Sequence, residues 1–137
     1  MQPLRRILLA DDDKSLRTGV VDLLSELEVE VLEAESGPEA LELGRRFRLH
    51  AALLDLHMPG CDGLEVLPHL LAFHRGLPCI VYSGNWTNLL AQEALRVGAF
   101  AVLHKPVDPQ RLRSEMRRAL ALWDHGGAGL TSPLPPP

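Results

Sequence analysis

Two short apolar runs in this chain end on aspartates. Residues 7–10 lead directly into Asp11 and Asp12. Residues 51–54 lead into Asp55, which is followed by a turn rich in proline and glycine. Apolar runs of this length, closed by turn residues, are typical of buried strands. Because the carboxyl ends of parallel strands meet at one edge of a sheet, we expect these carboxylates to share a crevice.

A third apolar run, residues 101–103, is followed by Lys105 two positions later. One ammonium among several carboxylates is suited to hold a divalent cation together with a phosphoryl group. Taken alone, Asp55 would more simply begin a turn, where aspartate is common. The convergence of three charged strand ends favours a chemical site instead.

The rest of the chain predicts the elements that would position these side chains. Strands are expected at residues 7–10, 29–32, 51–54, 79–82 and 100–103. Apolar residues at helical spacing predict a helix after each strand. Asp13, Ser36 and Asp108 are expected to cap three of these helices, so the third aspartate of the first cluster is assigned to structure. Regular alternation of strand and helix predicts an α/β fold with a parallel sheet.

Single residues set several of the expected helix boundaries. The first helix is expected to reach Leu27, and the fourth to begin at Trp86 and to stop at Gly98, a residue typical of helix ends. Pro68 lies inside the third helix, residues 64–73, so that helix is expected either to kink or to begin late.

Length and composition limit the classes of protein that the chain can belong to. At 137 residues, of which 46% are apolar, it is long enough for one domain with a core. A net charge of −4 and a sequence pI of about 5.8 do not suggest nucleic-acid binding by this chain alone. Cys61 and Cys79 lack metal-ligand spacing and are expected to be reduced thiols.

The ends of the chain differ in composition from its centre. Residues 1–124 are expected to form the folded domain, and residues 125–137, rich in glycine and proline, a disordered tail or linker. No apolar stretch is long enough to span a membrane, and the start lacks the features of a signal peptide. We therefore expect a cytoplasmic location.

The chain resembles the receiver domain of response regulators, the phosphoryl-accepting half of two-component signalling. The resemblance extends from about residue 5 to residue 123 and rests on short motifs in a fixed order. These are Asp11-Asp12, Asp55 with Met58-Pro59 and Asp62-Gly63 behind it, Ser83-Gly84, Gly98-Ala99 and Lys105-Pro106. The resemblance implies a flavodoxin-like, doubly wound (βα)5 fold, with five parallel strands in the order 2-1-3-4-5 and the site between strands one and three.

The resemblance also implies roles for the acidic residues. Asp55 would accept the phosphoryl group as a covalent nucleophile. Asp12 would bind Mg²⁺ directly and Asp11 through water, Asp55 would also be a metal ligand, and His57 would offer its backbone carbonyl to the metal. The His57 side chain could lie over the phosphoryl site or point to solvent, and the sequence leaves both open.

Two further residues would contact the phosphoryl group itself. Ser83 would do so through its hydroxyl and Lys105 through its ammonium. The family has a cis bond before Pro106, which would turn the lysine inward. Receiver domains usually carry tyrosine or phenylalanine three residues before this lysine, where this chain has Val102 and only Phe100 nearby. We therefore expect the switch through Ser83 and Val102 to couple weakly to the output surface.

In function, the resemblance implies a signalling domain rather than an enzyme. It would take a phosphoryl group from a sensor histidine kinase or a phosphotransfer protein, with Mg²⁺ as cofactor, and hydrolyse it slowly. It would signal by contacting a downstream protein, as a monomer or weak dimer, without binding nucleic acid or membrane.

Three other classes of protein fit the sequence less well. A flavodoxin-type cofactor protein needs a first loop that holds phosphate, which Asp11 and its neighbours would repel. A phosphatase with an aspartyl nucleophile generally has a second aspartate where His57 stands. A receiver-like scaffold that is never phosphorylated is disfavoured by the complete set of Asp12, Asp55, Ser83 and Lys105.

Overall fold

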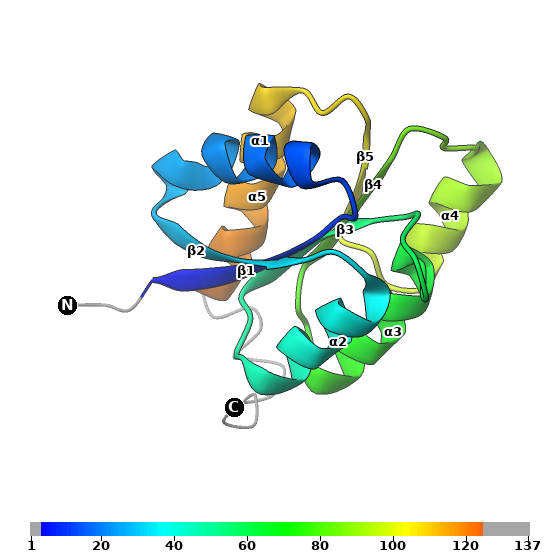
Figure 1. The fold of residues 1–137 in the computed structure, drawn as a ribbon, viewed down its shortest axis with the longest axis horizontal. Coiled ribbons are helices and arrows are strands. Elements are labelled where there is room, and N and C mark those ends of the chain that lie inside the picture. Colours follow the sequence, from blue (N-terminus) through cyan, green and yellow to red (C-terminus); the bar gives the residue numbers. More distant parts are fainter. Residues whose placement is uncertain (1–3, 125–137) are drawn as a thin grey trace.

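The computed structural model describes residues 4–124, which form a parallel sheet covered by helices on both faces (Figure 1). The strands are β1 (Arg5–Ala10), β2 (Val29–Ala34), β3 (Ala51–Asp55), β4 (Cys79–Ser83) and β5 (Ala101–His104). The helices are α1 (Lys14–Leu24), η1 (Ser25–Leu27, a 3-10 turn), α2 (Gly37–Arg46), α3 (Gly63–Phe73), α4 (Asn88–Arg96) and α5 (Pro109–Asp124). Within the described residues the five strands lie in the order β2-β1-β3-β4-β5, so the expected fold class and strand order are confirmed.

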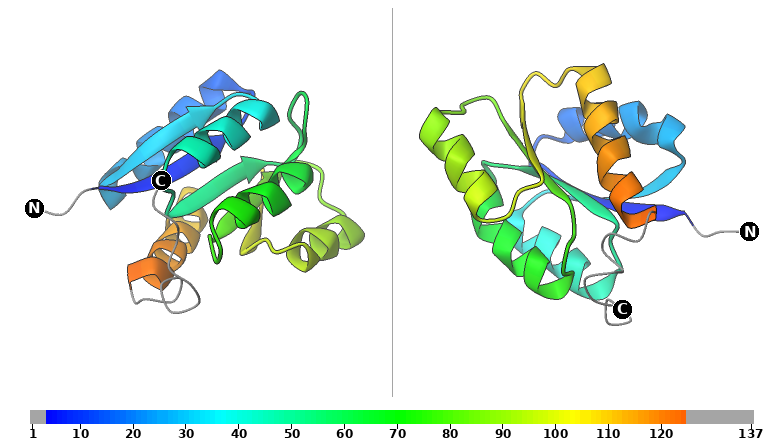
Figure 2. Two further views of the ribbon diagram at one scale, coloured as in Figure 1. Left: turned by 90° about the horizontal axis from the view of Figure 1, so that it is seen from below. Right: turned by 180° about the vertical axis from the view of Figure 1, so that it is seen from behind.

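The sheet divides the interior into two cores. Helices α1 and α5 cover one face, and α2, α3 and α4 cover the other (Figure 2). Side chains of β3 and β4 alternate between the two cores, and every residue of these strands is buried. This burial on both faces explains why the two strands are almost entirely apolar in sequence. The proposed tail, residues 125–137, lies outside the described residues, so the expected domain boundary stays a prediction.

The strand register brings the charged strand ends to one place. Strands β1 and β3 are neighbours, paired from Ile7 with Ala51 to Ala10 with Leu54. Their chains leave in opposite directions, because β1 leads towards β2 and β3 leads towards β4. This divergence opens the crevice in which α/β sheets of this type bind ligands.

Several helix boundaries were predicted correctly, and each depends on a specific hydrogen bond or backbone angle. The Asp13 side chain accepts from the backbone N–H of Leu16 at 3.1 Å and caps α1. Ser36 caps α2 in the same way. Gly98 follows the end of α4 with a φ of +114°, a left-handed conformation that favours glycine.

Other boundaries were predicted wrongly. The helix α1 ends at Leu24, because the next turn tightens into η1 and Glu28 turns the chain with a φ of +56°. The helix α4 begins at Asn88, since Thr87 rather than an earlier residue caps it. The strand β2 extends to Ala34, because it pairs with β1 along the full length of both strands.

The late beginning considered for α3 is also wrong. This helix begins at Gly63, where Asp62 and Glu65 form reciprocal side-chain to backbone hydrogen bonds that hold its first turn. Pro68 lies inside the helix. In the part of the chain that the structure describes, no helix is both long and apolar enough to cross a membrane.

Candidate functional site

Three carboxylates gather where β1 and β3 end. One side-chain oxygen from each of Asp11, Asp12 and Asp55 lies within 4.8 Å of the others. Asp11 is 0% exposed and Asp55 is 4% exposed, whereas Asp12 faces solvent. Such a set of hard oxygen donors, open on one side, fits a cation that keeps several water ligands, as Mg²⁺ does.

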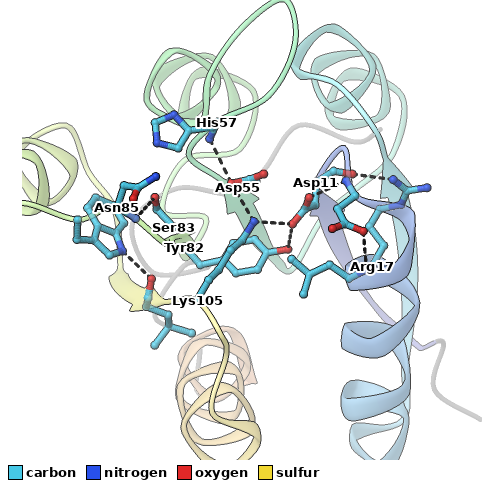
Figure 3. Close-up of polar contacts among 12 residues, drawn as sticks. Asp11, Arg17, Asp55, His57, Tyr82, Ser83, Asn85 and Lys105 are labelled. Carbon is cyan, nitrogen blue, oxygen red and sulfur yellow. Dashed lines mark hydrogen bonds and ion pairs between the residues drawn. The ribbon is translucent and has the colours of Figure 1, made fainter.

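Lys105 bridges the two buried carboxylates. Its Nζ lies 3.1 Å from Asp11 Oδ2 and 3.2 Å from Asp55 Oδ1 (Figure 3). The bond between Lys105 and Pro106 is cis, as expected. One ammonium balances only part of the negative charge of three aspartates, and the remaining negative charge attracts a cation.

Asp55 is a desolvated carboxylate held by two donors. Burial raises the pKa of Asp55 above its ordinary value, and the nearby charge of Asp11 adds to this increase. The backbone N–H of His57 donates to Asp55 Oδ1 at 3.2 Å and, together with Lys105, opposes the increase. Asp55 is therefore a partly desolvated carboxylate held in one orientation at the end of a strand, an arrangement that suits nucleophilic chemistry.

Asp11 is held from several sides. Its Oδ1 accepts from the backbone N–H of Asp13 at 2.8 Å, and its Oδ2 accepts from the Tyr82 hydroxyl at 2.5 Å. Arg17, which is buried in α1, donates to the Asp11 carbonyl at 2.7 Å and pairs with Glu33 on β2. Neither Tyr82 nor Arg17 was expected from sequence. The only available signal was the position of the single tyrosine, at a strand end next to Ser83.

Ser83 and His57 lie on the other side of Asp55 from Asp11 (Figure 3). Ser83 is fully buried, and its Oγ accepts from the backbone N–H of Asn85 at 3.0 Å. The His57 side chain is exposed, and its ring points away from Asp55 (Figure 3). Of the two orientations left open for this ring, the structure shows the one towards solvent.

The side chain of Val102, on β5, packs into one of the two cores. It is half-buried and packs with Trp86 against the core beneath α3 and α4. The indole Nε1 of Trp86 donates to the carbonyl oxygen of Leu103 at 2.6 Å (Figure 3). The loop after β4 is therefore tied directly to β5 by an aromatic residue that had been assigned to a helix.

The described site thus joins carboxylates, an ammonium and a hydroxyl at the ends of four parallel strands. Residues 7–117 match the response regulator receiver domain family. The chain belongs to this family.

The receiver is also similar to solved structures. A CheY-like receiver domain protein from Methanospirillum hungatei JF-1 has a TM-score of 0.84 and 27% sequence identity, and the match covers 90% of this chain and 98% of that one. The chemotaxis protein CheY4 of Vibrio cholerae has a TM-score of 0.80 and 28% identity, covering 86% and 100%.

Curated relatives show the same family at the level of sequence. A response regulator receiver protein from Anaeromyxobacter sp. (strain Fw109-5) is 34% identical over 80% of this chain and 46% of its own length. Sporulation initiation phosphotransferase F of Bacillus subtilis is 26% identical over 85% of this chain and 94% of its own length. The chain spans only 29% of another relative, the transcriptional regulatory protein ZraR of Salmonella typhimurium, with 34% identity. The Anaeromyxobacter and Salmonella relatives are thus more than twice as long as the segment that they share with this receiver.

Proposed function

We propose that this receiver accepts a phosphoryl group on Asp55 and signals through the contacts that the phosphorylated form makes. An oxygen of the Asp55 carboxylate attacks phosphorus, the bond from phosphorus to the donor nitrogen or oxygen breaks, and an acyl phosphate results. The observation that carries the proposal is the ion-paired cluster: Lys105 lies 3.1 Å and 3.2 Å from two buried carboxylates, beside a third that is exposed.

Each remaining site residue has a role in this proposal. Lys105 pairs with the phosphoryl oxygens as a compact point charge. Ser83 donates its hydroxyl to the same group, and its present bond from Asn85 leaves the hydroxyl proton available. Asp11, Asp12, Asp55 and the carbonyl of His57 are the proposed metal ligands, Asp12 directly and Asp11 through water. Mg²⁺, when bound, neutralises the negative charge that the phosphoryl oxygens bring.

The proposed donor is a sensor histidine kinase or a phosphotransfer protein, and the proposed output is a downstream protein partner. Membership of the receiver family and the similarity to a sporulation phosphotransferase support this assignment. Slow hydrolysis of the acyl phosphate would end the signal. We further propose a monomer or weak dimer located in the cytoplasm.

The test is phosphorylation in vitro. Incubation with acetyl phosphate and Mg²⁺ should add one phosphoryl group that hydroxylamine removes, as measured by intact mass. The Asp55→Asn variant should stay unmodified, because an amide cannot form the acyl phosphate. Full modification of this variant would refute the assignment of Asp55.

Two neighbouring aspartates supply matched controls. Asp12→Ala should remove the dependence of phosphorylation on Mg²⁺, because its exposed carboxylate is a proposed direct ligand. Asp13→Ala should leave that dependence in place, since Asp13 caps α1 through Leu16. Equal loss in both variants would show that the acidic pair has been assigned one residue early.

A further inference from the structure

Tyr82 lies inside the site although no role has been given to it so far. It is paired with Asp55 across β3 and β4, and its side chain faces the core covered by α1 and α5. The ring is 0% exposed. Its hydroxyl passes beyond β3 and donates to Asp11 Oδ2 at the end of β1, at 2.5 Å (Figure 3).

The Tyr82 hydroxyl donates its proton to Asp11, because an ionised carboxylate oxygen can only accept. The ring is packed in the core, so its hydroxyl stays in place when groups on the open side of the site move.

Asp11 Oδ2 has a second donor, on a side chain that is partly exposed. Lys105 Nζ donates to the same oxygen at 3.1 Å, and it also pairs with Asp55 at 3.2 Å. Its side chain is 23% exposed and its ammonium lies 4.6 Å from the centre of the Tyr82 ring. A phosphoryl group on Asp55 would draw this ammonium towards its oxygens and away from Asp11.

We propose that Tyr82 is a positioning residue: it keeps Asp11 hydrogen-bonded while Lys105 moves from Asp11 to the phosphoryl group, and so strengthens the phosphorylated state. This inference rests on the proposed function and extends it to the regulation of the same site. Without the hydroxyl, departure of Lys105 would leave Oδ2 of a fully buried carboxylate with no donor among the described residues, a costly arrangement. With the hydroxyl in place, the ammonium can leave because Asp11 Oδ2 keeps one of its two donors.

The test compares Tyr82→Phe with the wild type in two titrations of the full chain. Beryllofluoride in the presence of Mg²⁺ mimics the phosphoryl group, and its affinity should fall by about tenfold, as for one lost hydrogen bond to a charged group. Mg²⁺ alone, titrated without beryllofluoride, should bind no more weakly than to the wild type, because Lys105 then stays at Asp11. Ile80→Val, on the same face of β4, is the control for a small loss of core atoms.

Each outcome of these two titrations either supports or overturns the inference about Tyr82. Equal beryllofluoride affinity in the two proteins would overturn the inference, and so would a parallel loss of Mg²⁺ and beryllofluoride binding, which is the sign of a merely structural role. A wild type that binds no beryllofluoride would overturn the proposed function and this inference with it. The hydrogen bond itself is tested apart from any phosphoryl group: a double-mutant cycle of Tyr82→Phe with Asp11→Ala, measured by thermal unfolding, should show coupling, and its absence would overturn the inference alone.

Discussion

Replacing Lys105 by methionine removes the ammonium that Asp11 and Asp55 share. Removal of one partner from a buried ion pair costs about 3–5 kcal/mol. The Lys105 side chain is 23% exposed, so solvent screens part of the interaction and we expect a loss of about 2–3 kcal/mol in the free energy of unfolding. For a folded part of this size that loss lowers Tm by roughly 8–12 °C.

Magnesium should reverse much of this loss. At the proposed site in the wild type, Mg²⁺ would meet three aspartates and one ammonium, whereas in Lys105→Met it would meet the aspartates alone. The cation should therefore bind the variant more tightly, and a ligand that binds only the folded state raises stability by RT ln(1 + L/Kd), where L is the free ligand concentration, so the gain grows as Kd falls. The increase in Tm on adding Mg²⁺ should be larger in the variant than in the wild type.

The assay is thermal unfolding by circular dichroism, in EDTA and in excess Mg²⁺. Lys14→Met is the matched control, because Lys14 is the only other lysine and is exposed. If Lys105→Met is as stable as Lys14→Met in EDTA, the buried pair contributes no net stability. If Mg²⁺ raises Tm equally in all three proteins, the reasoning about the surplus charge of the cluster is wrong.

Two other predictions concern the packing of α2 on α3 and the route of signal transmission. His74 is bonded to the Gly44 carbonyl at 2.7 Å, and burial lowers the pKa of its imidazole. The neutral ring therefore stabilises the fold fully above the unfolded pKa of 6.5, and this stabilisation is lost as pH falls through the lower folded pKa. Urea unfolding at pH 7 and pH 5 should therefore show a smaller acid-induced loss of stability in His74→Gln than in the wild type, and an equal loss would refute this. Val102→Ala should leave the beryllofluoride-induced change in Trp86 fluorescence, measured in a Trp123→Phe background, within about a factor of two of the wild type, because Val102 has little rotamer freedom. Loss of that change would show that Val102 transmits the signal after all.

Much of the fold could be predicted from local pattern. The strands β3 and β4 are short apolar runs closed by turn residues. Few structures other than a strand buried on both faces give this sequence pattern. Caps at Asp13 and Ser36 could be predicted because their hydrogen bonds span only three residues. Asp55 and Lys105 were found because each stands at the charged end of an apolar run.

The residues that were missed act across the sheet. The bond from Tyr82 to Asp11 joins side chains 71 positions apart, on strands that are not neighbours. In sequence Tyr82 is simply one more residue of an apolar strand. Trp86 was expected to begin a helix, and its bond to Leu103 depends on where the loop places the ring. Such contacts follow from strand register and loop path, which local periodicity does not determine.

The contact made by Trp86 also affects how the sheet ends. The strand β5 lies at one edge of the sheet, where it pairs with β4. The indole N–H donates to the carbonyl of Leu103 at 2.6 Å, just before this edge strand ends. The loop that carries Ser83 into the site is therefore fastened to the last strand of the sheet. Any movement that draws Trp86 away with this loop would release that attachment and loosen the end of the edge strand, next to Lys105.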